Sequence, residues 1–248
     1  MQPHTIILLL LGTLPIIIAQ QLWGRGLYHN GPYNFAGCTA EQGSRLIDVF
    51  KKTGYYLDNA VISEARKGST ASRTFKTFFS TNKQDDVTNV FTKMTTGATV
   101  RGSDGQDMIP SFVCANEGIP ELQQAHNACL DQPRIGFTLG GSFLIFLCPR
   151  FFTGSHYIDF PEPRLCPILP SGGGNTYQTN NMEGRVYINQ NRMALAIHEL
   201  AHKYTVEKAP ETYLINECIM RAPDVQLGNA DNYAFFASSM YMNPDSHA

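Results

Sequence analysis

Two histidines spaced one helical turn apart constrain this chain more than any other feature of its sequence. His198 and His202 lie in the segment MALAIHELAHKYTVEKAPETYLINEC, which covers residues 193–218. On an α-helix the side chains of residues i and i+4 lie on the same face. Apolar residues at helical spacing surround the pair: Met193, Ile197, Leu200, Ala201 and Tyr204. We therefore expect a helix that begins near Asn191 and places both imidazoles where they can bind one metal ion.

Glu199 adds a chemical function to this helix. It lies about 100° around the helix axis from His198, too far to bind the same ion but able to reach a water molecule beside it. A catalytic zinc ion has three protein ligands and a water molecule, whose pKa it lowers to about 7. Glu199 is therefore a candidate for the general base that activates this water. The alternative is a pair of histidines on an ordinary helix that binds no metal.

The first residues of the chain indicate export. Residues 6–18 form an apolar run that is interrupted by Gly12 and Pro15 and is shorter than the roughly 20 residues of a membrane helix. We interpret residues 1–19 as a signal peptide and residues 20–248 as a single domain of a secreted, extracellular protein. Six cysteines follow: Cys38, Cys114, Cys129, Cys148, Cys166 and Cys218. An even number without a Cys-x-x-Cys pair predicts three disulfides in an exported protein.

The charge of the chain excludes some classes of partner. Charged residues make up 16% of the sequence, the formal net charge is −2, and there is no run of basic residues. Proteins that bind nucleic acids or anionic membrane surfaces carry such runs. We therefore expect no nucleic-acid partner and, after removal of the signal peptide, no membrane partner.

Apolar periodicity predicts helices in the first half of the chain. Segments 39–66, 70–81 and 85–94 have apolar residues at helical spacing, and the first of these helices is expected to be kinked at Gly54. The other two are expected to pack on the first. At this spacing their phenylalanines are more typical of a core than of a substrate groove.

The middle of the chain predicts a small sheet. The apolar run over 141–149 indicates an interior strand, and a second strand is expected around Val100. A Gly- and Asn-rich loop over 169–184 and a short strand over 185–190 precede the histidine helix. The order predicts an α+β fold, with a helical part at about residues 38–96 and a part with the sheet and the active site at about 97–248.

Three motifs resemble a known family of zinc peptidases. HELAH, then ETYLINEC and LGNADNYAFFA, within Leu195–Met240, are similar to the aspzincin metallopeptidases: deuterolysin and the fungal proteins with a lysine-specific metallo-endopeptidase domain. The resemblance implies a zincin-like fold and one Zn²⁺ ion. It also implies that His198 and His202 are ligands, that Glu199 is the base and that Tyr213 stabilises the oxyanion.

The third ligand is where the sequence departs from this family. The family ligand is an aspartate three residues before the tyrosine, and Pro210 stands at that position. Glu211 is the nearest carboxylate, and its longer side chain could compensate for the shift, so we assign it as the third ligand. Glu207 and Glu217 are alternatives. Asp231 is interpreted as a residue of the first turn of a later helix, where the helix dipole favours an acid.

The resemblance also implies a disulfide pairing. Cys38 with Cys114 and Cys129 with Cys148 correspond to the two bridges of the family in order and approximate loop length. This leaves Cys166 with Cys218, a bridge that would connect the segments before and after the histidine helix. Spacing alone does not define these pairs.

Two functions remain open from the sequence. The first is a secreted zinc metalloendopeptidase that acts as a monomer and hydrolyses protein or peptide substrates. The alternative is a non-catalytic or degenerate secreted zinc-binding protein related to these peptidases. Glu199 favours the peptidase, because metal capture alone needs no carboxylate there, whereas the absence of the family aspartate favours the alternative.

Overall fold

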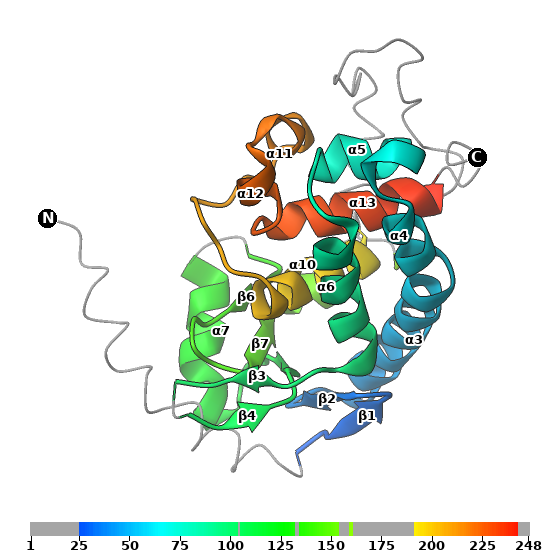
Figure 1. The fold of residues 1–248 in the computed structure, drawn as a ribbon. Coiled ribbons are helices and arrows are strands. Elements are labelled where there is room, and N and C mark those ends of the chain that lie inside the picture. Colours follow the sequence, from blue (N-terminus) through cyan, green and yellow to red (C-terminus); the bar gives the residue numbers. More distant parts are fainter. Residues whose placement is uncertain (1–24, 104, 132–133, 154–158, 161–190, 243–248) are drawn as a thin grey trace, which may run out of the picture. The chain divides into compact units, whose positions relative to one another are not determined.

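The computed structural model describes residues 25–103, 105–131, 134–153, 159–160 and 191–242 (Figure 1). The predicted signal peptide, the loop over 169–184, the strand over 185–190 and Cys166 lie outside the described residues. The chain divides into two compact units. The first contains the described residues of 1–48 and 97–154, and the second contains those of 49–96 and 155–248.

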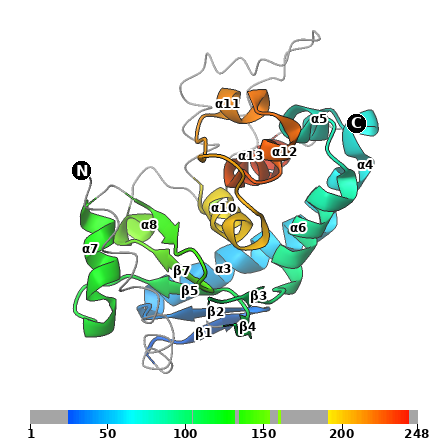
Figure 2. The ribbon, with the colours of Figure 1, turned by 60° about the vertical axis from the view of Figure 1, so that its left-hand side comes forward.

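A five-stranded mixed sheet forms the centre of the first unit (Figure 2). In spatial order its strands are β1 (Tyr28–Asn30), β2 (Tyr33–Ala36), β5 (Ser111–Cys114), β7 (Leu144–Leu147) and β6 (Gly136–Thr138). The three middle strands are parallel, and each edge strand is antiparallel to its neighbour. All residues of β7 are buried, which confirms the predicted interior strand.

Apolar packing and two disulfides connect this sheet to the rest of the first unit. The unit also contains a 3-10 turn (Pro120–Leu122), α7 (Gln123–Asp131), α8 (Pro149–Thr153) and a two-stranded ribbon of β3 (Val100–Arg101) and β4 (Asp107–Met108). Val113, Leu122 and Phe146 belong to one buried cluster. The disulfides Cys38–Cys114 and Cys129–Cys148 are formed, with S–S distances of 2.06 and 2.04 Å, as the resemblance implied.

The predicted order, helices first and sheet afterwards, is wrong. β1 and β2 precede the long helix, and β2 pairs with β5, which lies far along the chain at Ser111–Cys114. These strands have three or four residues, too few to show a clear alternation of apolar and polar side chains. Their pairing depends instead on contacts that are distant in sequence.

The second unit is built from helices. They are the second half of α3 (Ala40–Tyr56), a π-helical segment (Leu57–Val61), α4 (Ile62–Ala71), α5 (Arg73–Phe79), α6 (Gln84–Thr96), α10 (Arg192–Tyr204), α11 (Ile215–Met220), α12 (Pro223–Gln226) and α13 (Ala230–Met242). The three predicted helices are present, and α5 and α6 both contact α4. The kink expected at Gly54 is not found, because Gly54 lies inside regular α3 and the irregular turn is π-helical, at Leu57–Val61.

An aromatic core fixes α13 and, through it, α10. The ring of Tyr233 lies 4.9 Å from Phe79 and 5.4 Å from Phe91, and Phe236 lies 5.6 Å from Phe79, measured between centroids. All four rings are fully buried. α10 contacts both α13 and α6, and α10 and α13 lie side by side in Figures 1 and 2. Within the described residues, no helix has the length and apolar character needed to cross a bilayer.

Candidate metal centre

The helix that carries the two histidines begins where the sequence predicts it. Asn191 caps α10, since its Oδ1 accepts a hydrogen bond of 2.7 Å from the amide of Ala194. Arg192 is buried and forms an ion pair of 2.8 Å with Asp159. The apolar stripe is buried as expected, and it includes Met193, Ile197 and Leu200. The stripe therefore holds the histidine face of α10 in a fixed rotation.

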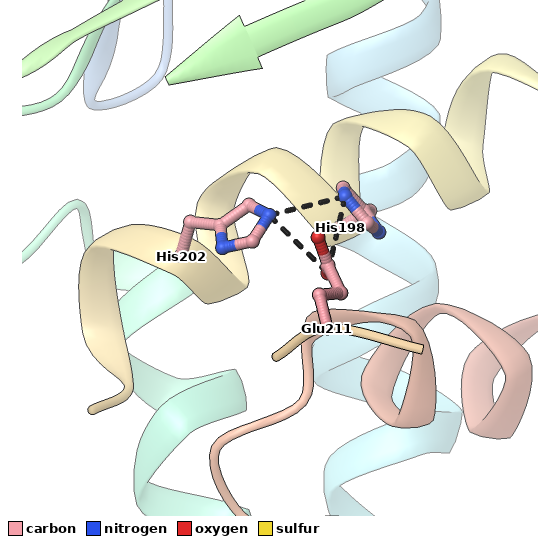
Figure 3. A group of neighbouring side chains, drawn as sticks. All are labelled: His198, His202 and Glu211. Atoms are coloured by element: carbon pink, nitrogen blue, oxygen red, sulfur yellow. Dashed lines mark hydrogen bonds and ion pairs between the residues drawn. The ribbon is translucent and has the colours of Figure 1, made fainter. Parts of the chain in front are cut away.

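His198, His202 and Glu211 converge on one point (Figure 3). The two Nε2 atoms lie 3.1 Å apart. Glu211 Oε1 lies 3.3 Å from Nε2 of His202 and 3.5 Å from Nε2 of His198. The three side chains are only 11–21% exposed. The nearest carboxylate to Pro210 thus joins the two histidines, whereas Glu207 and Glu217 are exposed and outside this group.

The spacing of these three atoms fits a tetrahedral zinc ion. Zinc bonds of about 2.0–2.2 Å to nitrogen and oxygen require donor atoms roughly 3.3–3.6 Å apart at the corners of a tetrahedron. The observed separations are 3.1, 3.3 and 3.5 Å. Glu211 Oε1 is buried and accepts no hydrogen bond of normal geometry from the described residues. A cation between the three donors would compensate for the buried negative charge of Glu211.

Asp231 is a functional residue that the sequence reasoning missed. It lies in the first turn of α13, as expected, but its Oδ1 is also 2.7 Å from Nδ1 of His198. This contact places the proton of His198 on Nδ1 and leaves the Nε2 lone pair for a metal. Burial acts to lower the pKa of His198, but the contact with Asp231 and the charges of Glu199 and Glu211 together outweigh it and raise this pKa to about 9.

The motif Asn-Ala-Asp-Asn-Tyr carried the only signal for Asp231. Histidine ligands of metal ions generally donate their second N–H to a carboxylate or a carbonyl. A search for such a partner was therefore justified. However, Asp231 is 33 residues from His198, and its register on α13 follows only from the packing of the two helices.

Glu199 is a buried carboxylate next to the two histidines in sequence. It is only 6% exposed, and its Oε2 has no hydrogen-bond partner among the described residues. Burial raises the pKa of Glu199 above its ordinary value, and the charges of His198 and His202 counteract this effect only in part. A buried carboxylate oxygen without a hydrogen bond is costly for folding, which favours a chemical rather than a structural role.

Tyr213 lies over the exposed side of the site. Its ring is stacked on that of His198, with centroids 6.2 Å apart and planes 26° apart. Its hydroxyl bonds to Glu211, and burial together with this contact raises the pKa of Tyr213. Burial acts to raise the pKa of Glu211, but contacts with His202, His198 and Tyr213 outweigh it and lower this pKa. Tyr213 is 60% exposed, so its ring can also be reached from outside.

The third predicted disulfide, Cys166 with Cys218, stays a prediction, because Cys166 lies outside the described residues. Among the described residues the thiol of Cys218 is free and fully buried. Its Sγ lies 3.2 Å from the carbonyl oxygen of Thr212 and 3.3 Å from the side-chain nitrogen of Asn229. The sulfur is therefore occupied by hydrogen bonds in the interior.

Comparison with known proteins finds similarity among solved structures. Neither a protein-family model nor a curated protein matches this sequence. Among solved structures, the chain is similar to a zinc peptidase from Grifola frondosa, with 15% sequence identity and a TM-score of 0.46. The match covers 81% of this chain and 96% of that chain. The assignment of the metal centre therefore depends on the geometry described above.

Proposed function

We propose that this protein is a zinc-dependent endopeptidase in which His198, His202 and Glu211 hold one zinc ion. The observation that carries the proposal is the separation of the three donor atoms, 3.1–3.5 Å, beside the buried carboxylate of Glu199. Three protein ligands leave a fourth position for water or substrate, which is the arrangement of catalytic rather than structural zinc sites.

The chemistry follows from the residues around the ion. Zinc, when bound, polarises a carbonyl group and lowers the pKa of water. Glu199 would accept a proton from the water molecule that attacks the peptide carbonyl and then donate it to the leaving amine. Tyr213 would donate a hydrogen bond to the carbonyl oxygen as negative charge develops there. Asp231 would keep His198 in the tautomer that binds the metal through Nε2.

The proposed place of action is outside the cell. Two disulfides, Cys38–Cys114 and Cys129–Cys148, are expected in an oxidising compartment. The apolar start of the sequence supports the same proposal. We propose a secreted monomer whose partners are protein or peptide substrates.

A non-catalytic or degenerate zinc-binding protein is the alternative function. The same three ligands would serve it, and the use of a glutamate from a loop in place of the family aspartate favours it. Glu199 separates the two proposals, since a protein that only captures metal gains nothing from a buried carboxylate whose Oε2 has no hydrogen-bond partner among the described residues.

Metal analysis combined with one substitution tests the peptidase. We expect one zinc per chain, and cleavage of an unfolded protein substrate that a chelator abolishes and added zinc restores. Glu199→Gln should retain zinc and lose about 10²–10⁴-fold in kcat, because the general base is removed. Glu207→Gln, at an exposed acid, is the control and should be fully active. Stoichiometric zinc without cleavage over a broad pH range would favour the alternative, and a chain without zinc would exclude both.

A further inference from the structure

The proposed third ligand lies in a segment that has no regular secondary structure. α10 ends at Tyr204 and α11 begins at Ile215, and Glu211 and Tyr213 lie between them on either side of Thr212. Within the part of the chain that the structure describes, no ladder of backbone hydrogen bonds fixes these residues. Their position must therefore depend on side chains from elsewhere, and Thr212, which is only 2% exposed, is where such contacts concentrate.

Asn229 binds both polar groups of the Thr212 backbone. Its Oδ1 accepts a hydrogen bond of 3.0 Å from the amide of Thr212, and its Nδ2 lies 3.3 Å from the carbonyl oxygen of Thr212. A carboxamide has an acceptor and a donor side by side. It can therefore make the two hydrogen bonds that a neighbouring strand would make to the backbone of one residue. An ionised Asp side chain cannot make both bonds, because it only accepts. Asn229 is itself buried, at 5% exposure.

Asn229 is in turn held in place by Asn232. Nδ2 of Asn229 also donates to Oδ1 of Asn232 at 2.8 Å, and Asn232 donates to the carbonyl oxygens of Phe78 at 2.6 Å and Cys218 at 3.2 Å. Phe78 belongs to α5, in the aromatic core. The amide chain therefore connects the loop that carries Glu211 to the interior of the helical unit.

The start of α13 contacts both sides of the metal centre. Asp231 bonds to His198 on α10, and Asn229, two residues earlier, bonds to Thr212 in the loop. The short segment from Asn229 to Asp231 therefore contributes to the distance between Glu211 and the two histidines of α10. Arg221 adds a contact from the other side of Thr212, through the threonine hydroxyl.

We propose that Asn229 is a positioning residue for Glu211, and this inference rests on the proposed zinc site. Its carboxamide holds the backbone of Thr212 so that Glu211 Oε1 faces the two histidine nitrogens before a metal binds. The loop then loses little conformational freedom when zinc binds. The affinity for zinc is therefore higher than it would be if Glu211 lay in a flexible loop. Asn229 touches neither a metal ligand side chain nor a substrate.

The test measures zinc affinity of the full chain by competition with a chromophoric chelator, and stability of the metal-free chain by thermal unfolding. Asn229→Ala should weaken zinc binding about 10–100-fold. Gln226→Ala is the matched control, because Gln226 is a fully buried amide that bonds to the carbonyl oxygens of Ile219 and Cys218 and has no bond to Thr212. It should lower the unfolding temperature similarly but change zinc affinity less than about threefold.

Two further variants separate a positioning role from a general loss of structure. Asn229→Asp keeps the acceptor for the Thr212 amide and loses the donor, so it should fold and show an intermediate loss of affinity. In a Glu211→Ala background, Asn229→Ala should cause no additional loss, because it acts through Glu211.

Equal zinc affinity of Asn229→Ala and the unchanged chain would overturn the inference, and so would additive losses in the double variant. Both results leave the proposed function intact, since they require that the unchanged chain binds zinc. Zinc binding by the unchanged chain without proteolysis would contradict the proposed function and leave the positioning role standing.

Discussion

His198 and His202 lie on a regular helix, whereas Glu211 lies in a loop with neither helix nor strand. The helix sets the separation of its two imidazoles through its own backbone hydrogen bonds, and its apolar face is buried against α13 and α6. The loop has no such internal support, and its backbone is held by the side chains of Asn229 and Arg221. The positions of the two histidines are thus determined by their own helix, whereas the position of Glu211 is determined by residues distant in the sequence.

This difference separates what can be read from a short motif from what cannot. A helix-borne pair of ligands needs only the correct spacing and an apolar stripe. A loop-borne ligand needs partners elsewhere in the chain that fix its backbone, and the motif contains no information about them. The two sides should therefore respond differently to substitution.

The largest effect is expected on the helix side. His198→Ala removes a proposed ligand from a rigid frame. Zinc affinity should fall by roughly 10²–10³-fold or more. This is the loss expected if each ligand contributes an equal share of the binding free energy. Competition with a chelator measures this, and His29→Ala, at an exposed histidine in β1, is the control. Unchanged affinity in His198→Ala would exclude the proposed centre.

A smaller effect is expected on the loop side. Glu211→Asp shortens the side chain by one bond of about 1.5 Å, and a backbone held by Asn229 cannot follow. We expect zinc affinity to fall by roughly 10²-fold, while Glu207→Asp has no effect. If Glu211→Asp binds zinc as well as the unchanged chain, the loop moves freely and the contrast between the two sides is wrong.

The next effect concerns the contact that supports the helix side. Asp231→Asn keeps an oxygen that can accept the Nδ1 proton of His198 but removes the negative charge. Zinc affinity should fall by about tenfold, the lower end of the range for such outer contacts. Asp224→Asn, at an exposed acid, is the control. Equal affinities in the two variants would mean that Asp231 has no influence on the metal ligand.

The smallest effect is expected at the beginning of the helix. Asn191→Ala removes the cap of α10 and should lower the free energy of unfolding by about 1 kcal/mol. Zinc affinity should not change, because the buried stripe still fixes the helix. Denaturant unfolding of the metal-free chain measures the stability. A large loss of zinc affinity would show that α10 depends on distant support as the loop does.

The helices were the most predictable part of the fold. α5, α6 and α10 have apolar residues at helical spacing over two or more turns, and β7 is apolar throughout. The strands β1, β2, β5 and β6 were missed because three or four residues carry no periodicity and their partners lie far along the chain. The π-helical segment at Leu57–Val61 was also missed, since a single glycine suggested a kink elsewhere.

The candidate site divides in the same way. His198, Glu199 and His202 follow from spacing alone, and Glu211 followed as the carboxylate next to Pro210. The remaining parts depend on tertiary packing. Asp231 contacts His198, and Asn229 contacts Thr212, only because α13 packs against α10 and begins next to the loop that carries Glu211.

α13 belongs both to the aromatic core and to the metal centre. Tyr233 and Phe236 are fully buried, and Asp231 lies in the first turn of the same helix. Folding of the helical unit and the proposed zinc binding would therefore be thermodynamically linked, because the unfolded chain has no preformed site. At a free zinc concentration 100 times the dissociation constant, this linkage would contribute about 2.7 kcal/mol to stability. The metal would thus act as a part of the interior, and its removal would loosen the helices that the chemistry requires.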